Sequence, residues 1–435
     1  MILDWKEYTD TVRQAAAEGC VLLKNEEEVL PLKGGEKIAV FGRIQRHYYK
    51  SGTGSGGMVN VSRVVGILDA LLEEPSLCVD EELLEIYDRW EQTNPFDEGL
   101  GWANEPWSQV EMPVSDELVI GAEQRNDMAL ILIGRTAGED QDNVDEKGAY
   151  RLSDTEADLI EKVTKYFNRV AVIFNVGSIM DMSHPCLKQC QALLYSWQGG
   201  MIGGYGVADV LMGRIDPSGR LTDTIAERLE DYPSTANFGD EIRNYYQEDI
   251  YVGYRYFETV AKEKVMYPFG YGLSYTEFEE EVADFQESKG EIILTVTVRN
   301  TGNRNGRQVV QIYVEAPQGK LGKPARVLAG FGKTRQLEPE ETEELEFRIL
   351  PYTFASYDDQ GVTGHAYSYV LESGEYQVYA GKNVRDAVCA GRFCLGEIRI
   401  IEQLSQNMAP ILPFQRMKPQ APASSFSANE AAGTG

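Results

Sequence analysis

The sequence of 435 residues is longer than one ordinary hydrophobic core requires, so two or three domains are expected. Its 43% hydrophobic and 25% charged residues are typical of a soluble globular protein. With 69 acidic and 41 basic residues, the net charge of -28 disfavours nucleic acid and anionic membranes as partners, because like charges repel. A neutral ligand or a protein partner fits this charge better.

No secretory signal is visible, because residues 1–8 carry charges where the apolar core of a signal would lie. The longest apolar runs are only strand-sized, so we expect no membrane-spanning segment. We also expect the protein to be cytoplasmic. The six cysteines are too sparse for a disulfide framework. His184, Cys186 and Cys190 are zinc-ligand types, but packed thiols and a local histidine cap explain them better. We therefore predict neither a metal nor a cofactor.

Residues 1–230 alternate between helix-like and strand-like patterns. Apolar positions at helical spacing predict helices at residues 7–19, 61–72, 153–167 and 202–212. Short, unbroken apolar runs predict strands at residues 38–41, 128–133, 170–175 and 192–197. Because such strands are buried on both faces, the pattern predicts an α/β domain with a doubly wound, mostly parallel sheet.

The predicted strand at residues 128–133 is followed by a loop dense in carboxylates. Ligands of α/β proteins bind at the carboxyl ends of strands, and Gly138 would let a substrate approach Glu139. A general acid needs a carboxyl group that keeps its proton near neutral pH. A neighbouring carboxylate or an apolar wall has this effect, because each disfavours the charged form of the carboxyl group. Glu139 is the candidate acid. A merely solvated loop is the alternative, and Glu139 has rivals in Asp140, Asp142, Asp145 and Glu146.

A glycine-rich loop at residues 50–57 contains a formal G-x-G-x-x-G pattern. In a dinucleotide site these glycines follow the first strand directly, whereas here about ten residues intervene. We expect instead that the loop presents the hydroxyls of Thr53 and Ser55, with backbone amides, to a neutral polar ligand. A flexible surface loop without a ligand is the alternative.

From about residue 281 the apolar pattern changes to a period of two. Alternation predicts strands at residues 291–299, 308–314, 343–349 and 375–380, separated by turn clusters. Short strands at this spacing predict an all-β immunoglobulin-like or fibronectin type III-like sandwich. The predicted division is an α/β domain, a tyrosine-rich connecting segment, the sandwich, and a linker or disordered tail, at residues 1–230, 231–280, 281–402 and 403–435.

Taken together, several motifs resemble those of the glycoside hydrolase family 3 β-glucosidases. They stand in the family's order at residues 20–25, 30–32, 52–56, 136–140, 197–200, 208–211, 216–221, 252–257 and 267–275. The resemblance implies a retaining hydrolysis, in which an Asp on a (β/α)8 barrel attacks the anomeric carbon. It implies that Glu139, on the α/β domain, acts first as acid and then as base. It also implies that Ser55 lies where the family's glycine loop touches the sugar.

The sequence departs from the family because nothing in it resembles the barrel's Ser-Asp-Trp nucleophile motif. A barrel would need about 250 further residues. Some members carry the barrel after the sandwich domains, and the chain resembles the front part of such a member. We therefore expect a β-glucosidase-type hydrolase that acts on a β-glucoside or oligosaccharide, supplies the acid/base, and docks a barrel on its α/β domain. The alternatives are a non-catalytic carbohydrate-binding or scaffolding module and a nucleotide-dependent enzyme.

Overall fold

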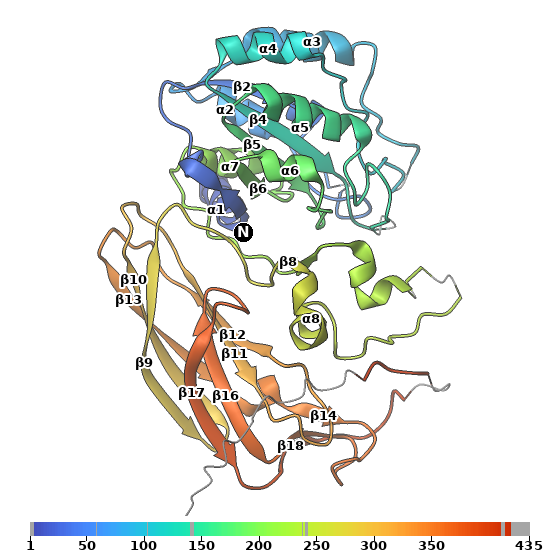
Figure 1. The fold of residues 1–435 in the computed structure, drawn as a ribbon, viewed down its shortest axis with the longest axis vertical. Helices are drawn as coiled ribbons and strands as arrows, with labels where there is room; N and C mark the ends of the chain where they lie inside the picture. The colour runs from blue at the N-terminus through green and yellow to red at the C-terminus, as the bar shows by residue number, and fades with distance from the viewer. Residues whose placement is uncertain are drawn as a thin grey trace, which may run out of the picture.

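The computed structural model describes residues 4–57, 59–101, 103–139, 143–236, 238–239, 242–409 and 414–418. An α/β domain occupies the upper half of Figure 1 and a β-sandwich the lower half. The segment between them contains α8 (Tyr254–Val260) and β8 (Val265–Tyr267), and β8 pairs with β7 (Ile225–Ala226). The predicted fold class, a mostly parallel α/β sheet followed by an all-β sandwich, is confirmed.

The α/β domain is built on a six-stranded sheet with the order β1-β6-β5-β4-β2-β3. The strands are β1 (Val21–Asn25), β2 (Lys37–Phe41), β3 (Cys78–Val79), β4 (Met128–Arg135), β5 (Val170–Val176) and β6 (Ala192–Tyr195). Strand β1 runs antiparallel to β6, and the other neighbours are parallel. Every residue of β4 and β5 is buried, which explains their unbroken apolar sequences. The four predicted strands are present, and the edge strands β1 and β3 are additional.

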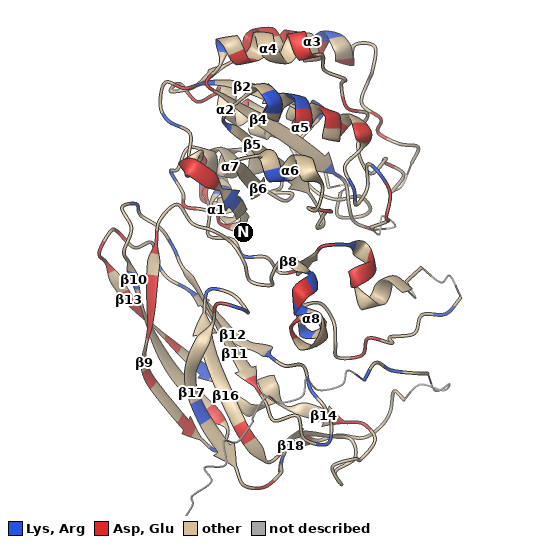
Figure 2. Ribbon diagram, in the orientation of Figure 1, with Lys and Arg blue, Asp and Glu red and all other residues tan. Residues whose placement is uncertain are grey.

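Helices cover both faces of this sheet (Figure 1). They are α1 (Trp5–Gly19), α2 (Ile67–Leu72), α3 (Glu81–Glu91), α4 (Asp116–Arg125), α5 (Asp154–Tyr166), α6 (Pro185–Gln189) and α7 (Gly203–Leu211). Residues of α3 to α6 join one apolar cluster, and residues of α1, α2 and α7 join another. Figure 2 shows the charged residues on the helices, while the central strands carry almost none. The sheet therefore forms the apolar core of the domain.

The helix predicted at residues 61–72 is wrong in its first half. Helix α2 begins only at Ile67, after the cap residue Gly66, whose backbone N–H donates to Asp69 Oδ2 at 2.8 Å. The backbone N–H of Val65 donates to the carbonyl of Met201 at 2.8 Å, which commits this residue to a long-range contact. A tertiary hydrogen bond therefore overrides the helical spacing of the apolar residues.

The sandwich consists of antiparallel sheets that contain all four predicted strands. One sheet holds β9 (Phe278–Ser288), β10 (Glu291–Asn300) and β13 (Thr342–Ile349), and a second holds β11 (Val309–Glu315), β12 (Val327–Lys333), β16 (Gly374–Gly381) and β17 (Val388–Leu395). Their inner faces share one core, which includes Leu294, Ile312 and Val378. A smaller sheet holds β14 (Ser356–Asp358), β15 (Ser368–Leu371) and β18 (Arg399–Gln403).

The predicted tail lies only partly within the described residues. Residues 404–409 and 414–418 form neither helix nor strand, and the backbone N–H of Met417 donates to the carbonyl of Gln247 at 2.7 Å. Residues 410–413 and 419–435 lie outside the described part. Among the helices that the structure describes, none has both the length and the apolar character required to cross a bilayer.

Charged contacts join the two domains. Glu18 at the end of α1 pairs with Lys333 of β12 at 2.7 Å and with Arg307 at 3.3 Å. The carboxylate of Asp216 accepts hydrogen bonds from the hydroxyl of Ser274 at 2.8 Å and the backbone N–H of Tyr275 at 2.7 Å. The ion pairs of Glu18 thus join the α/β domain to the sandwich, and the hydrogen bonds of Asp216 join it to the end of the connecting segment.

A buried ion pair anchors the loop that follows β4. Arg135 is the last residue of β4 and is 1% exposed. Its guanidinium makes two contacts of 2.7 Å with the carboxylate of Glu156 and donates to the carbonyl of Ala149 at 2.9 Å. Glu156 also accepts from the backbone N–H of Ser153 at 2.8 Å, which caps α5. The loop is therefore held at both ends.

Glu156→Gln should lower the free energy of unfolding of the α/β domain by about 3–5 kcal/mol, because it leaves the guanidinium of Arg135 buried without a counter-charge. Urea unfolding followed by tryptophan fluorescence measures this loss. The control is Lys147→Gln, which breaks the exposed pair between Lys147 and Asp154 and should cost less than about 1 kcal/mol. Equal losses in the two variants would contradict this role for the buried pair.

A second buried carboxyl, that of Glu111, holds the chain just after β2. It accepts hydrogen bonds from the backbone N–H groups of Arg43 at 2.9 Å and Met112 at 2.8 Å. Burial raises the pKa of Glu111 from 4.5 to about 8. Because the folded-state pKa lies above the unfolded value, the folded protein retains a proton that the unfolded chain has lost between these two pH values.

The free energy of unfolding should therefore fall as the pH rises from about 4.5 to about 8, by up to ~1.4 kcal/mol per pH unit from this group. Glu111→Gln keeps a carbonyl oxygen as an acceptor and removes the titration. Urea unfolding of both proteins at a series of pH values should give a flatter profile for the variant. Parallel profiles would show that Glu111 does not titrate in this range.

Candidate active site

Two loops that are distant in sequence meet at the carboxyl edge of the sheet. One leaves β4 and leads to Glu139, and the other leaves β2 and contains the glycine loop, residues 52–57. Thr53 pairs with Gly138 as an isolated parallel bridge. The backbone N–H of Thr53 donates to the carbonyl of Ala137 at 2.6 Å. The two loops thus continue the parallel pairing beyond the ends of their strands.

Glycine is required on both sides of this contact. Gly138 has φ +132, and a Cβ there would lie 2.7 Å from the carbonyl oxygen of Thr53. Gly54 has φ +78, and a Cβ there would lie 2.4 Å from Cβ of Glu139 and 2.7 Å from its Oε2. Side chains at these positions would push the loops apart, so the glycines permit the glycine loop to touch Glu139.

The three residues predicted for the site lie together. Oε2 of Glu139 accepts hydrogen bonds from the backbone N–H and the hydroxyl of Ser55, both at 3.2 Å. Glu139 and Ser55 are exposed residues, whereas Thr53 is buried and only 6% exposed. The hydroxyl of Thr53 donates to the backbone carbonyl of Glu139 at 3.1 Å. Contact of Thr53 and Ser55 with a substrate stays a prediction.

The rival carboxylates occupy different surroundings. Asp145 forms a two-point contact with Arg151, with distances of 2.5 and 2.7 Å. Glu146 is an exposed residue. Asp140 and Asp142 lie outside the described residues. Of these carboxylates in the described part of the loop, Glu139 is the one that contacts the glycine loop.

Sequence reasoning missed the residue that positions the start of the glycine loop. Asn175 lies near the end of β5 and is fully buried. Its Oδ1 accepts from the backbone N–H of Tyr49 at 2.8 Å, and its Nδ2 donates to the carbonyls of Tyr49 at 3.0 Å and Trp197 at 2.7 Å. A single amide at the end of an otherwise apolar strand was the available signal, because buried polar groups need partners.

The predicted cap at His184 is confirmed. Its Nδ1 accepts from the backbone N–H of Cys186, and Cys186 and Cys190 are buried free thiols. Burial raises the pKa of both thiols to about 12. Across the described residues, no three His, Cys, Asp or Glu side chains group in a way that could hold a metal ion.

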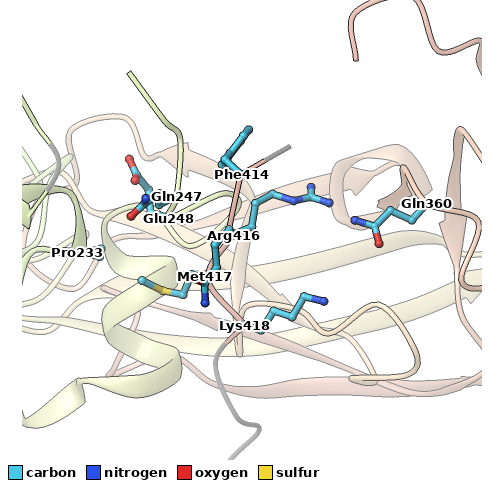
Figure 3. A pocket seen from close by; sticks show the side chains of 9 residues that line it. Pro233, Gln247, Glu248, Gln360, Phe414, Arg416, Met417 and Lys418 are labelled. Atoms are coloured by element: carbon cyan, nitrogen blue, oxygen red, sulfur yellow. The ribbon is translucent and has the colours of Figure 1, made fainter. Parts of the chain in front are cut away.

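One cavity lies away from this site. It has a volume of about 740 Å³ and lies between the connecting segment and residues 414–418 (Figure 3). A smaller cavity of about 280 Å³ lies beside α8, where its charged lining residues pair with one another as Arg385 with Glu258 and Arg326 with Glu315. Glu139 lines neither of these two cavities. Glu139 is an exposed residue in the loop that follows β4.

Comparison with known proteins agrees with the two-domain architecture. The glycosyl hydrolase family 3 C-terminal domain matches residues 20–275, and the fibronectin type III-like domain matches residues 308–384. A beta-glucosidase of Ruminococcus albus is 48% identical over 415 residues, which cover 95% of this chain and 44% of the relative. Beta-glucosidase A of Butyrivibrio fibrisolvens is 38% identical over 451 residues, covering 93% of this chain and 53% of that protein.

Solved structures match equally well. A beta-glucosidase from Paenibacillus barengoltzii superposes with a TM-score of 0.93 and 48% identity, over 97% of this chain and 47% of that one. Beta-glucosidase 3B from Thermotoga neapolitana, in complex with glycerol, superposes with a TM-score of 0.82 and 36% identity, over 91% of this chain and 55% of that one. The chain spans about half the length of the relatives it matches. By the family match over more than half of its residues, the chain belongs to glycosyl hydrolase family 3.

Proposed function

We propose that this chain forms the acid/base half of a retaining β-glucosidase-type glycoside hydrolase, and that Glu139 is the acid/base. The observation that carries the proposal is the contact between the carboxylate of Glu139 and the glycine loop at the carboxyl edge of the sheet. This edge is where α/β domains bind their ligands. The beta-glucosidases that match the chain over nearly its whole length support the choice of substrate class.

A second domain is needed to complete the site. A retaining glycosidase uses two carboxyl groups about 5–5.5 Å apart, and the second attacks the anomeric carbon. The described residues contain no (β/α)8 barrel, and Glu139 is exposed. We propose that a barrel carrying the nucleophile docks over the loops of Glu139 and Ser55. Its arrival would cover the exposed carboxyl group of Glu139 and enclose the substrate between the two domains.

In the proposed reaction, the carboxyl group of Glu139 acts as an acid in the first step and as a base in the second. In the first step, Glu139 gives its proton to the glycosidic oxygen as the bond from that oxygen to the anomeric carbon breaks. The barrel carboxylate forms a bond to the same carbon. In the second step, Glu139 takes a proton from water as the water oxygen displaces the barrel carboxylate. The sugar leaves with its original configuration, and Glu139 is again protonated.

The chain without a barrel should lack activity above background, because one carboxylate of the pair is missing. Purified 1–435 should hydrolyse an aryl β-glucoside no faster than its own Glu139→Gln variant, as measured by release of the aryl alcohol. A clear difference in rate would reveal a nucleophile within the chain and overturn the division of roles. Binding of glucose to the chain with no activity after barrel addition would favour the alternative, a carbohydrate-binding module.

The identity of the acid is testable in the full-length protein that carries the barrel. Glu139→Ala should slow cleavage of cellobiose about 10²–10⁴-fold, because a poor leaving group needs protonation. Cleavage of dinitrophenyl β-glucoside should be affected far less, and added azide should accelerate it by attacking the glycosyl-enzyme. Measurement of kcat/KM for both substrates checks this difference.

Asp142→Ala and Glu146→Ala serve as controls within the same loop. Neither should produce the leaving-group dependence or the azide rescue. If Glu146→Ala produced both effects while Glu139→Ala retained near-normal rates, the assignment of the acid within this loop would be wrong.

A further inference from the structure

The hydrogen bonds to Glu139 fall on one of its two carboxyl oxygens. Oε2 accepts from both the N–H and the hydroxyl of Ser55, each at 3.2 Å. No hydrogen bond from a described residue reaches Oε1. Within the described part of the chain, the two oxygens of this carboxyl group therefore differ in their hydrogen-bond partners.

The backbone around Ser55 is shaped for this contact. Gly54 lies directly against the side chain of Glu139, with φ +78 and no room for a Cβ. Thr53 is locked to the other loop by its N–H at 2.6 Å from the carbonyl of Ala137. Ser55 is thus the last residue of a short segment, residues 53–55, that runs beside the backbone of the Glu139 loop.

We propose that Ser55 is a positioning residue that holds Glu139 through Oε2, and that Oε1 is the oxygen that transfers the proton in both steps. This inference rests on the proposed role of Glu139 as acid/base. An ionised carboxylate only accepts hydrogen bonds, and a protonated one carries its hydrogen on one oxygen. Because two donors point at Oε2, the acidic hydrogen of Glu139 resides on Oε1.

The chemistry then follows atom by atom. The Oε1–H bond breaks as the hydrogen moves to the glycosidic oxygen, while the bond from that oxygen to the anomeric carbon breaks and the nucleophile bonds to the carbon. On return, Oε1 takes a proton from water as the water oxygen bonds to the anomeric carbon and the nucleophile departs. The donors at Oε2 stabilise the carboxylate that exists between the two steps.

Positioning matters here because Glu139 is exposed and its side chain has three rotatable bonds. A general acid must lie within hydrogen-bond reach of the atom it protonates. Two donors on one oxygen restrict the rotation of the carboxyl group and direct Oε1 away from the glycine loop. The hydroxyl of Ser55 keeps its lone pairs, so it can still accept a hydrogen bond from a sugar hydroxyl.

The test uses the full-length protein that carries the barrel, with kcat/KM measured for cellobiose and for dinitrophenyl β-glucoside. Ser55→Ala removes the hydroxyl and keeps the backbone donor, so it should lower kcat/KM for cellobiose about 3- to 10-fold. The value for the activated glucoside should change less than about 2-fold. Ser55→Thr, which restores a hydroxyl, should recover most of the loss.

Gly54 in the glycine loop and Gly34 in the turn before β2 form a pair of alanine substitutions, one inside the candidate site and one away from it. Gly54→Ala drives a methyl group into Glu139 and should lower kcat/KM for cellobiose about 10²-fold, the scale of a 1 Å displacement of a catalytic group. Gly34→Ala, before the other end of β2, meets no atom within 4 Å and should stay near the original rate on both substrates. Circular dichroism melts show whether each variant is folded. If Gly54→Ala is not folded, the Ser55 variants alone test the positioning role.

A double variant separates positioning from sugar binding. If Ser55 acts through Glu139, then Ser55→Ala should add no loss when Glu139 is already Ala. If Ser55 acts only on the sugar, the KM of both substrates should rise equally and the loss should persist in the Glu139→Ala background. That second result would overturn the inference. The proposed function fails separately, if Glu139→Ala itself lacks leaving-group dependence.

Discussion

The pairing of Thr53 with Gly138 is the contact on which the candidate site depends. Parallel strands bring their carboxyl ends to one edge of a sheet, but side chains on neighbouring loops meet only if the loops themselves are joined. A backbone hydrogen bond from Thr53 to Ala137 joins the two loops. The absence of side chains at Gly54 and Gly138 lets the loops approach each other closely. Without these features, Glu139 would be one exposed carboxylate among several.

Buried polar side chains hold the two loops in position. The Arg135–Glu156 pair anchors the loop after β4, Asn175 binds the backbone at Tyr49, and Glu111 fixes the chain after β2. Each lies in or beside an apolar sheet, where an unsatisfied polar group is costly and a satisfied one restricts the backbone. The site therefore combines rigid supports with an exposed carboxylate.

This arrangement is compatible with the proposal that a second domain completes the site. Glu139 and Ser55 are exposed in this chain, and neither of the two cavities described contains Glu139. The ion pairs of Glu18 with Lys333 and Arg307 connect the sandwich to the α/β domain. A barrel that docks on this assembly would meet a preformed surface, which lowers the entropic cost of association.

The sequence by itself determined the two-domain architecture, since the apolar runs of β4 and β5 and the period-two pattern of β10 are local consequences of burial. The resemblance to the family also named Glu139 and the glycine loop as candidates for the site. Only the tertiary structure decided that α2 starts at Ile67 and that Ser55 donates to Glu139 Oε2. These features depend on contacts between residues far apart in sequence, such as Val65 with Met201, and local patterns carry no record of such partners.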